Sequence, residues 1–284
     1  MAWMIRSRTK IALARSAYWA IMLARRTAGL GSRVSTIRDG LRWELDLQEG
    51  IDLAIYLFGM FERETVMACR RWIKPGDVVF DIGANVGAHT LQCARSVGAT
   101  GKVVGFEPTR YAFTKLVRNV ACNPELVERI VTEQVMFGEK PGERIPSLLY
   151  SSWPLMGHTE VHDKHCGRLM DTEGAQATSL DSYVERTGIK RVGFIKLDVD
   201  GHECAVLRGG STTLKRDRPV MVMELAPYVL DETGTSLEDL CAILSCQEYQ
   251  LADMTTGHPL SLDPRELKQM IPDGCGVNVL ALPS

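Results

Sequence analysis

Glycines and an acidic residue follow the end of an apolar segment near residue 80 of this 284-residue chain. Residues 81–87 read DIGANVG, so that an aspartate closes the segment and glycines stand at 83 and 87. Glycines at these places permit a tight turn and a close approach of the backbone to a ligand. A helix that begins after such a turn offers free N–H groups. The run therefore predicts a loop that binds part of a nucleotide-like cofactor.

Glu107 ends a second apolar segment, about 20 residues after that loop, where an acid can accept both hydroxyls of a ribose. A glycine loop with a ribose acid serves nicotinamide dinucleotides as well as S-adenosylmethionine. A dinucleotide fingerprint reads Gly-x-Gly-x-x-Gly, whereas this loop reads Gly-x-x-x-Gly after Asp81. A carboxylate there is unfavourable beside a pyrophosphate but suits an ammonium and a sulfonium. We favour S-adenosylmethionine, with a nicotinamide-dependent oxidoreductase as the alternative.

Four ionisable residues crowd a third place, where an apolar segment passes into a helix: Asp198, Asp200, His202 and Glu203. His202 titrates near neutrality and is the better general base. Asp198 follows the strand into the cleft, where it could orient His202, bind a substrate hydroxyl or hold a metal ion. Glu203 could serve the helix dipole alone. We expect Asp198, His202 and Glu203 to form the catalytic group.

Two metal sites can be read from residue types, and neither is favoured. Asp198 and Glu224 end neighbouring strands, so their hard oxygen ligands could converge on Mg²⁺. We favour Glu224 as a structural or substrate-binding acid. Histidine and cysteine residues that are three or four positions apart lie on one face of a helix, where they could also bind a zinc ion. The residues concerned are His158, His162, His165 and Cys166. They stand in a polar, irregular segment, for which a solvated lid is the preferred interpretation.

An α/β alternation must position these groups. The buried strands that we expect cover residues 78–81, 102–107, 130–137, 192–199, 219–225, 247–253 and 276–282. Between them, helices are expected at 86–97, 111–119, 203–214 and 236–246, and a strand at 41–47 and a helix at 52–73 precede them. Seven strands interleaved with helices indicate a Rossmann-like, doubly wound, mostly parallel sheet with helices on both faces. Such sheets bind ligands outside the carboxyl ends of their strands.

Residues 1–38 are expected to form a basic N-terminal extension. A catalytic domain is expected at 39–284, with an irregular insertion or lid at 138–177. The first acidic residue is Asp39, and eight lysines and arginines precede it. The segment 11–23 is too short for a bilayer span of about 20 apolar residues, and Arg15 interrupts it. A basic amphipathic helix can lie on an anionic membrane or dock on a partner. Packing on its own domain is the favoured alternative.

Composition narrows the class of protein further. Hydrophobic residues make up 45% of the chain and the net charge is −2, which fits a globular domain and argues against a general nucleic-acid binder. The eight cysteines are scattered without a Cys-x-x-Cys pair. Scattered cysteines in apolar surroundings indicate reduced thiols and a cytoplasmic protein, with membrane contact only through the N-terminal helix.

Four blocks in this order resemble the FkbM-type methyltransferase family over roughly residues 40–255. They are Asp81–Thr90, Gly105–Pro108, Thr178–Tyr183 and Ile195–Glu203. Gly59–Glu62 and Arg218–Glu224 also resemble it, whereas Asp200 stands where the family commonly has glutamate. The resemblance implies a class I methyltransferase that uses S-adenosylmethionine, releases S-adenosylhomocysteine and methylates oxygen. The segment 138–177 matches no pattern of the family.

The resemblance also assigns parts of the cofactor to residues. It implies that the loop at 81–87 holds the methionine portion, that Glu107 holds the ribose, and that Met136 flanks the adenine. The expected cofactor-binding residues are Asp81, Gly83, Ala84, Asn85, Gly87, His89, Thr90, Glu107, Pro108 and Met136. The expected acceptor is a hydroxyl on a small molecule, sugar, glycolipid or secondary metabolite. A catalytically silent cofactor-binding scaffold is a further alternative, against which the group around His202 speaks.

Overall fold

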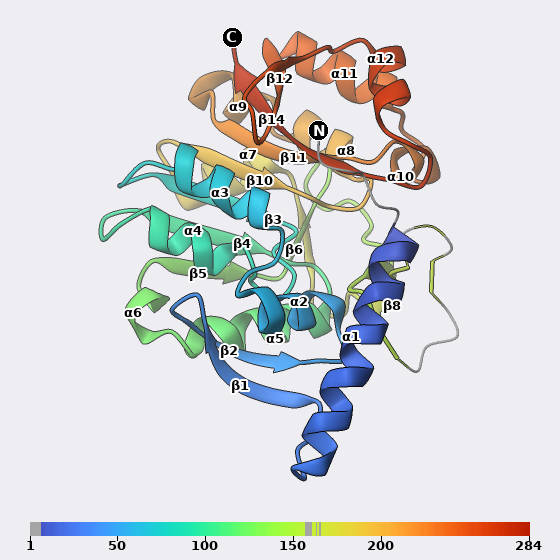
Figure 1. Cartoon of the computed structure of the whole chain (residues 1–284). Helices are drawn as coiled ribbons and strands as arrows, with labels where there is room; N and C mark the ends of the chain where they lie inside the picture. Colours follow the sequence, from blue (N-terminus) through green and yellow to red (C-terminus); the bar gives the residue numbers. More distant parts are fainter. Residues whose placement is uncertain (1–6, 157–160, 163, 165) are drawn as a thin grey trace.

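The computed structural model describes residues 7–156, 161–162, 164 and 166–284. Its centre is an eight-stranded sheet with the order β13-β12-β14-β11-β10-β3-β4-β5 (Figure 1). The strands from β5 to β11 run parallel, and β14, β12 and β13 pair antiparallel at one edge. Their bounds are β3 (Val78–Ile82), β4 (Lys102–Phe106), β5 (Ile130–Glu133), β10 (Phe194–Leu197), β11 (Val220–Leu225), β12 (Tyr249–Asp253), β13 (Pro259–Leu260) and β14 (Val277–Pro283). The chain therefore has the Rossmann-like, mostly parallel sheet that its sequence predicts.

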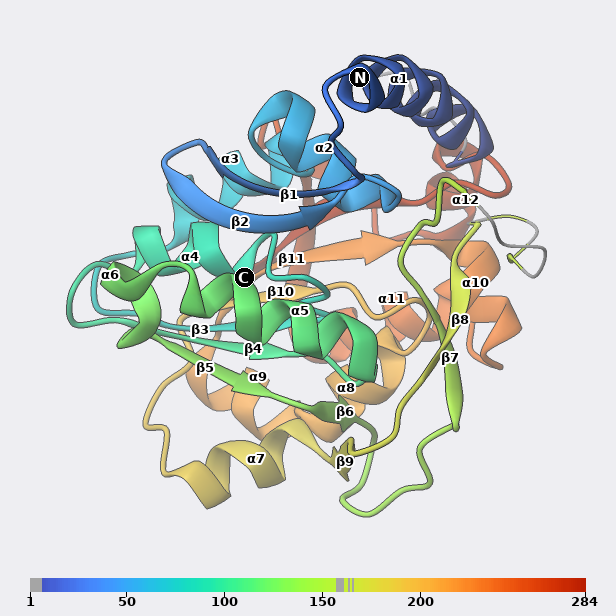
Figure 2. The ribbon, with the colours of Figure 1, turned by 90° about the horizontal axis from the view of Figure 1, so that it is seen from below.

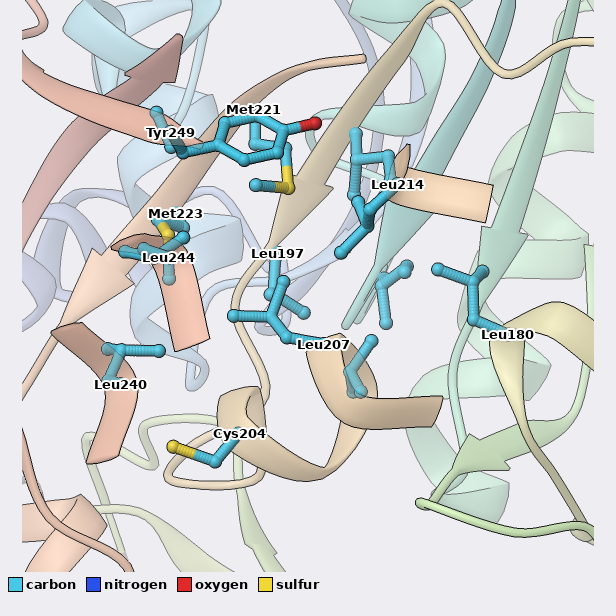
Figure 3. Packing of buried hydrophobic residues seen from close by; sticks show 14 of the residues in the cluster. Leu180, Leu197, Cys204, Leu207, Leu214, Met221, Met223, Leu240, Leu244 and Tyr249 are labelled. Atoms are coloured by element: carbon cyan, nitrogen blue, oxygen red, sulfur yellow. The ribbon is translucent and has the colours of Figure 1, made fainter. Parts of the chain in front are cut away.

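The central strands are apolar because both faces of the sheet are covered. Neighbouring residues point to opposite faces, so Phe194 joins one core and Ile195 joins the other. The core that contains Ile195 is packed by α7 (Leu180–Thr187), α8 (Glu203–Gly209), α9 (Ser211–Asp217), α11 (Leu237–Cys246) and α12 (Pro264–Met270) (Figure 3). The opposite core is packed by α3 (Arg63–Trp72), α4 (Thr90–Ser96), α5 (Arg110–Ala121) and α6 (Pro124–Val127). The doubly wound arrangement is confirmed.

Four expectations about single elements were wrong in detail, and the first is the expected helix at 203–214, which is divided into α8 and α9. The expected helix at 52–73 is two helices, α2 (Gly50–Phe58) and α3, because Gly59 ends α2 with φ +84° and Glu62 precedes α3 with φ +44°. The expected strand at 130–137 divides into β5 and β6 (Val135–Phe137), and β6 leaves the main sheet to pair with β9 (Gln176–Thr178). The sheet has eight strands rather than seven, since the two-residue β13 adds an edge that is too short for a sequence pattern.

The segment 138–177 is less irregular than its sequence suggests. It contains β7 (Leu148–Ser151) and β8 (Arg168–Asp171), which pair as an antiparallel ribbon beside the main sheet (Figure 2). α10 (Pro227–Glu232) follows β11. The ribbon and α10 flank the carboxyl ends of the central strands and supply side chains to the cavity described below.

The N-terminal extension folds back on the domain. α1 (Ser7–Thr27) is followed by β1 (Arg33–Arg38) and β2 (Leu41–Asp46), which form a hairpin around Asp39 and Gly40. Both turn residues have positive φ, as a two-residue hairpin turn requires. β2 confirms the strand expected at 41–47, whereas β1 had not been predicted. None of the described helices is long and apolar enough to cross a bilayer.

Candidate active site

A cavity of about 400 Å³ opens at the carboxyl ends of the parallel strands. The loops after β3, β4, β10 and β11 form its floor and walls, and the β7–β8 ribbon and α10 contribute to its rim. Of the site residues expected from the sequence, those that line the cavity are Gly83, Ala84, Asn85, His89, Glu107, Pro108, Met136, Asp198, His202 and Glu224. Four expected residues lie outside this lining, namely Asp81, Gly87, Thr90 and Glu203. The strand topology therefore brings most of the candidates together.

Gly83 is held against the end of β10 more closely than any other residue type allows. Its φ is +85°, and a Cβ atom there would lie 1.7 Å from the carbonyl oxygen of Asp198. Its own carbonyl accepts a hydrogen bond of 2.8 Å from the Lys196 ammonium. Gly87 has another task, because its Cβ would lie 2.9 Å from a methyl carbon of Leu116 on α5. Gly83 shapes the cavity floor, and Gly87 lets the loop pack on the helix behind it.

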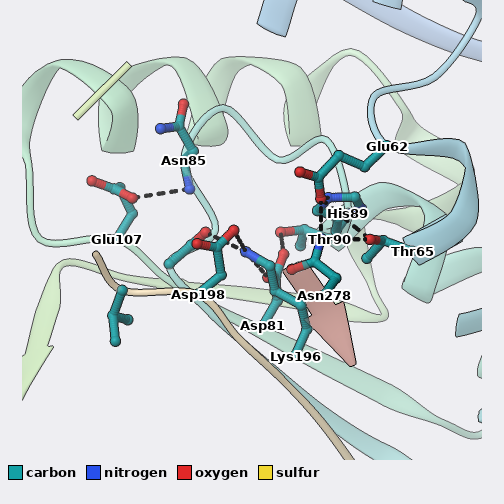
Figure 4. A network of polar contacts seen from close by, with 12 residues as sticks. Glu62, Thr65, Asp81, Asn85, His89, Thr90, Glu107, Lys196, Asp198 and Asn278 are labelled. Atoms are coloured by element: carbon teal, nitrogen blue, oxygen red, sulfur yellow. Dashed lines mark hydrogen bonds and ion pairs between the residues drawn. The ribbon is translucent and has the colours of Figure 1, made fainter. Parts of the chain in front are cut away.

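Glu107 joins the loops that follow β3 and β4 (Figure 4). One carboxylate oxygen accepts the Asn85 N–H at 2.9 Å. The other accepts the N–H of Thr109 at 2.9 Å and its hydroxyl at 2.5 Å. A carboxylate has about four acceptor positions, so about one is left for a ligand. Burial raises the pKa of Glu107 above its ordinary value, although these hydrogen bonds oppose the rise.

Asp81 lies beneath the cavity rather than in its wall. Its side chain is fully buried, and it accepts a hydrogen bond of 2.6 Å from the Thr90 hydroxyl. Its second oxygen lies 3.6 Å from the Lys196 ammonium. In these positions Asp81 and Thr90 support the loop and the lysine. The expected contact of these two side chains with the cofactor stays a prediction.

Lys196 is a central residue to which sequence reasoning gave no role. Its side chain is buried on β10, and its ammonium lies 3.2 Å from Asp198. Burial alone would lower the pKa of Lys196, but the carboxylates of Asp198, Asp81 and Glu62 together raise it. Lys196 is therefore a buried cation. The signal was a single ionisable residue inside an apolar strand, because such residues are buried only with partners.

Three carboxylates converge at the ends of β10 and β11, where Asp198 adjoins the glycine loop. One carboxylate oxygen from each of Asp198, Asp200 and Glu224 lies within 4.8 Å of the other two. Burial and the neighbouring charges of Asp198 and Asp200 raise the pKa of Glu224 well above its ordinary value. The proximity of Asp198 and Glu224 agrees with the sequence expectation, and Asp200 is an additional member of the group. Such a group attracts a cation or shares protons.

His202 and Glu203 follow this group but face different surroundings. His202 lines the cavity, and burial lowers its pKa below the ordinary value, so that a neutral ring is favoured. Glu203 is buried, and one of its oxygens lies within hydrogen-bonding distance of the N–H groups of Val199 at 3.2 Å and Gly201 at 3.4 Å. Burial raises the pKa of Glu203 to about 7. These contacts hold the turn between β10 and α8, and the expected place of Glu203 in the catalytic group stays a prediction.

At another wall, the expected residue His89 meets polar partners that the sequence did not predict. One oxygen of Glu62 accepts hydrogen bonds from the Asn278 amide at 2.9 Å and the Thr65 hydroxyl at 3.2 Å (Figure 4). The same oxygen lies 3.4 Å from a ring nitrogen of the buried His89. Burial would raise the pKa of Glu62, but His89 and Lys196 lower it below the ordinary value. A separation of 216 residues between Glu62 and Asn278 left no local pattern to find.

The segment 138–177 supplies one side of the cavity. Tyr150 and Ser151 line it from β7, and the Ser151 hydroxyl accepts a hydrogen bond of 3.2 Å from Asn85. His162 lies 2.9 Å from Glu232 on α10. Two residues of the zinc hypothesis, His158 and His165, lie outside the described residues. That hypothesis and the role of the segment as a lid both remain predictions.

The fold and the cavity together define a class I methyltransferase, in which a loop after the first strand of the parallel sheet faces an acid at the end of the second. A model of the Methyltransferase FkbM domain matches residues 81–251. The chain belongs to this family of S-adenosylmethionine-dependent methyltransferases. The oxidoreductase alternative loses its support, because membership implies S-adenosylmethionine as the cosubstrate.

Known proteins similar to this chain are distant. Hexuronic acid methyltransferase AglP of Haloferax volcanii is 25% identical over 167 residues, which cover 57% of this chain and 61% of that protein. The structure of methyltransferase FkbM from Methylobacillus flagellatus is 18% identical and has a TM-score of 0.42, covering 73% of this chain and 43% of that one. A methyltransferase from Aquifex aeolicus is 14% identical with a TM-score of 0.43, covering 82% and 95% of the two chains. The chain thus spans less than two thirds of AglP.

Proposed function

We propose that this protein transfers a methyl group from S-adenosylmethionine to a hydroxyl oxygen of a saccharide. The observation that carries the proposal is a single cavity with two unlike walls. One wall offers a glycine loop and a partly free ribose acid, Glu107, and the other offers a neutral imidazole, His202, and the carboxylates of Asp198 and Glu224. AglP, which acts on a hexuronic acid according to its name, supports a sugar as the acceptor class.

The first wall fits the cofactor in shape and in charge. Gly83 lines the cavity with backbone atoms alone, and Glu107 keeps about one acceptor position for a ribose hydroxyl. Pro108 and Met136 give the neighbouring wall an apolar surface for the adenine. Lys196 is the only lysine or arginine among the described lining residues, and several carboxylates surround it. Such a cavity attracts a ligand with a sulfonium and an ammonium group.

The second wall provides the groups that an alcohol needs as a nucleophile. Bound S-adenosylmethionine supplies a methyl group that is already activated on a sulfonium. Asp198 accepts a hydrogen bond from a neighbouring hydroxyl of the saccharide, which orients the acceptor hydroxyl for in-line attack while that hydroxyl donates to His202. The acceptor oxygen bonds to the methyl carbon while the carbon–sulfur bond breaks, and the hydroxyl proton passes to the neutral ring of His202. Glu203 holds the turn that carries His202.

A divalent metal ion at the second wall is the alternative means of activating the acceptor. The observation in its favour is the convergence of Asp198, Asp200 and Glu224 within 4.8 Å. Carboxylate oxygens are the ligands that Mg²⁺ prefers, and a bound cation lowers the pKa of a coordinated hydroxyl. Addition of EDTA to the transfer assay separates this alternative from a histidine base, because only the metal-dependent reaction should lose its turnover.

A binding measurement followed by a transfer assay tests the proposal. Calorimetry should detect binding of S-adenosylmethionine and S-adenosylhomocysteine but not of NAD. Incubation with a labelled methyl donor and a panel of neutral and uronic saccharides should then yield a labelled methyl ether, identified by mass spectrometry. Label on a nitrogen or a carboxylate oxygen would contradict the proposed target atom. Cofactor binding without transfer to any member of a broad metabolite extract would favour the silent scaffold.

The proposal also includes the compartment. All eight cysteines are free thiols in the structure, and five of them are buried. Buried thiols without disulfide partners are typical of reducing compartments, so we propose a cytoplasmic protein. Expression of the tagged protein in cells, followed by cell fractionation and detection of the tag, tests this proposal.

A further inference from the structure

α1 is attached to its own domain by one face only. Ile11, Tyr18 and Met22 are buried on that face, at the spacing of successive helical turns. They belong to a cluster whose other buried members are Leu47, Leu53 and Leu155. The helix therefore packs on the domain, and its opposite face points outward from the molecule (Figure 2).

The outward face lacks the charges that a solvated helix normally carries. Leu13 is 62% exposed, Leu23 is 70% exposed and Trp19 is 48% exposed. Five further residues of this arc are uncharged and exposed as well, namely Thr9, Ala12, Ser16, Ala20 and Ala24. At 100° per residue they form one continuous uncharged surface along the helix. We call these eight residues the outer face of α1.

Exposed basic side chains flank the outer face. Lys10 lies on one side of it, and Arg15 and Arg26 lie on the other, where Arg26 also covers the ring of Trp19 at 5.9 Å. No acidic residue balances them in the helix, since the first acid of the chain is Asp39. The surface thus combines exposed apolar side chains with charge of a single sign.

We propose that the outer face of α1 docks on an anionic lipid bilayer. Leu13, Trp19 and Leu23 enter the boundary between head groups and acyl chains, while Lys10 and Arg15 reach the phosphates. The uniform positive charge favours a lipid surface over a protein partner, whose surface mixes both signs. The helix lies in the plane of the membrane, because among the described residues no helix can span one.

The docked helix also adjoins the cavity. Trp153 packs on the cluster that buries α1, and its ring contacts Phe61 with centroids 5.6 Å apart. Both Trp153 and Phe61 line the cavity. Docking therefore places this wall of the cavity behind α1, one helix diameter of about 10 Å from the lipid surface. This step rests on the proposed function, and it assigns the saccharide acceptor to a class carried on membrane lipids.

Cosedimentation of the full chain with vesicles tests the docking. Vesicles of phosphatidylcholine with about one third phosphatidylserine should bind the protein, and pure phosphatidylcholine vesicles should bind it far less. Changing Lys10, Arg15 and Arg26 together to glutamine should weaken binding to the anionic vesicles by roughly 100-fold. The pair Leu13→Ser and Leu23→Ser should weaken it by roughly 10-fold or more.

Matched controls keep the test specific. The pair Val117→Ser and Val127→Ser removes exposed apolar side chains from α5 and α6. The triple change of Lys140, Lys190 and Arg191 to glutamine removes exposed charges elsewhere. Both controls should bind vesicles as the wild type does. Equal losses in the controls and in the α1 variants, or no binding of the wild type, would overturn the docking proposal.

Two further measurements separate docking from the proposed function. All variants should keep their affinity for S-adenosylhomocysteine, which shows that they are folded. A wild type that binds vesicles but not S-adenosylhomocysteine would contradict the function and leave docking intact. If docking holds, lipid-linked saccharides in anionic vesicles should be methylated faster than the same saccharides free in solution. Equal rates would overturn the lipid-carried acceptor.

Discussion

The two walls of the cavity are built on opposite principles. On the cofactor side Glu107 fixes the loops by three hydrogen bonds, and a lysine amine and a backbone carbonyl join Gly83 to β10. On the acceptor side, Asp198, Asp200 and Glu224 crowd together. The first wall is organised before a ligand arrives, whereas the second holds like charges that a ligand, proton or cation must relieve. A methyltransferase needs a fixed donor and an acceptor whose proton can leave, and the walls meet these needs separately.

The largest effect should come from His202, on the acceptor side. His202→Ala should lower kcat by roughly 10²–10⁴-fold, because the acceptor hydroxyl loses its general base. Affinity for S-adenosylhomocysteine, measured by calorimetry, should change little. His258→Ala removes an exposed histidine and should leave both quantities unchanged. Full turnover of His202→Ala, together with loss of wild-type turnover in EDTA and recovery in Mg²⁺, would replace the base with a metal.

Lys196 connects the two walls, and its loss should be the largest effect on stability. Lys196→Met leaves Asp81 buried without its ammonium, which should lower the free energy of unfolding by about 3–5 kcal/mol. Chemical denaturation measures this loss. Lys190→Met, at an exposed position, serves as the control. Adding Asp81→Asn to the first variant should recover part of the stability, and a strictly additive double variant would argue against this pairing.

Glu203 should give the protein a stability that depends on pH. Its pKa rises from an ordinary 4.5 to about 7 in the folded chain, so the folded state binds its proton more tightly than the unfolded state. The contribution is complete below pH 4.5 and is lost as the pH rises to about 7, by about 3 kcal/mol. Glu203→Gln keeps an acceptor for Val199 and should flatten this slope in denaturation curves between pH 5 and 7. An unchanged slope would show that other acids cause it.

Glu107 should give the smallest effect, and it acts on the cofactor wall alone. Glu107→Ala should weaken binding of S-adenosylhomocysteine by about 1.5–3 kcal/mol, the value of hydrogen bonds to a charged group. Calorimetry measures the change, and thermal melting shows whether the loop survives. Glu185→Ala, an exposed acid on α7, is the matched control. Unaltered affinity in the folded variant would remove Glu107 from the ribose site.

The sequence was most informative where chemistry follows directly after a buried strand. Gly83, Glu107 and Asp198 could be placed at one edge because the carboxyl ends of parallel strands meet there. Sequence patterns did not reveal the partners brought in by tertiary structure, such as the Glu62–Asn278 contact. They also identified Asp81 as a candidate without revealing that its side chain is buried beneath the cavity, because burial beneath a loop leaves no periodic signal. The division between β5 and β6 falls at the polar residues Thr132, Glu133 and Gln134, which the single expected strand at 130–137 passed over.

Gly83 has a consequence for the order of events in a catalytic cycle. A missing side chain lets the cofactor loop touch the backbone of Asp198, so the two walls share one rigid contact. A movement of Asp198 toward an acceptor must displace the loop that carries the donor, or be resisted by it. Binding of the donor then changes the binding free energy of the acceptor. Thermodynamic linkage requires that binding of the acceptor changes the binding free energy of the donor by the same amount. A residue with no side chain would thus make donor and acceptor binding cooperative.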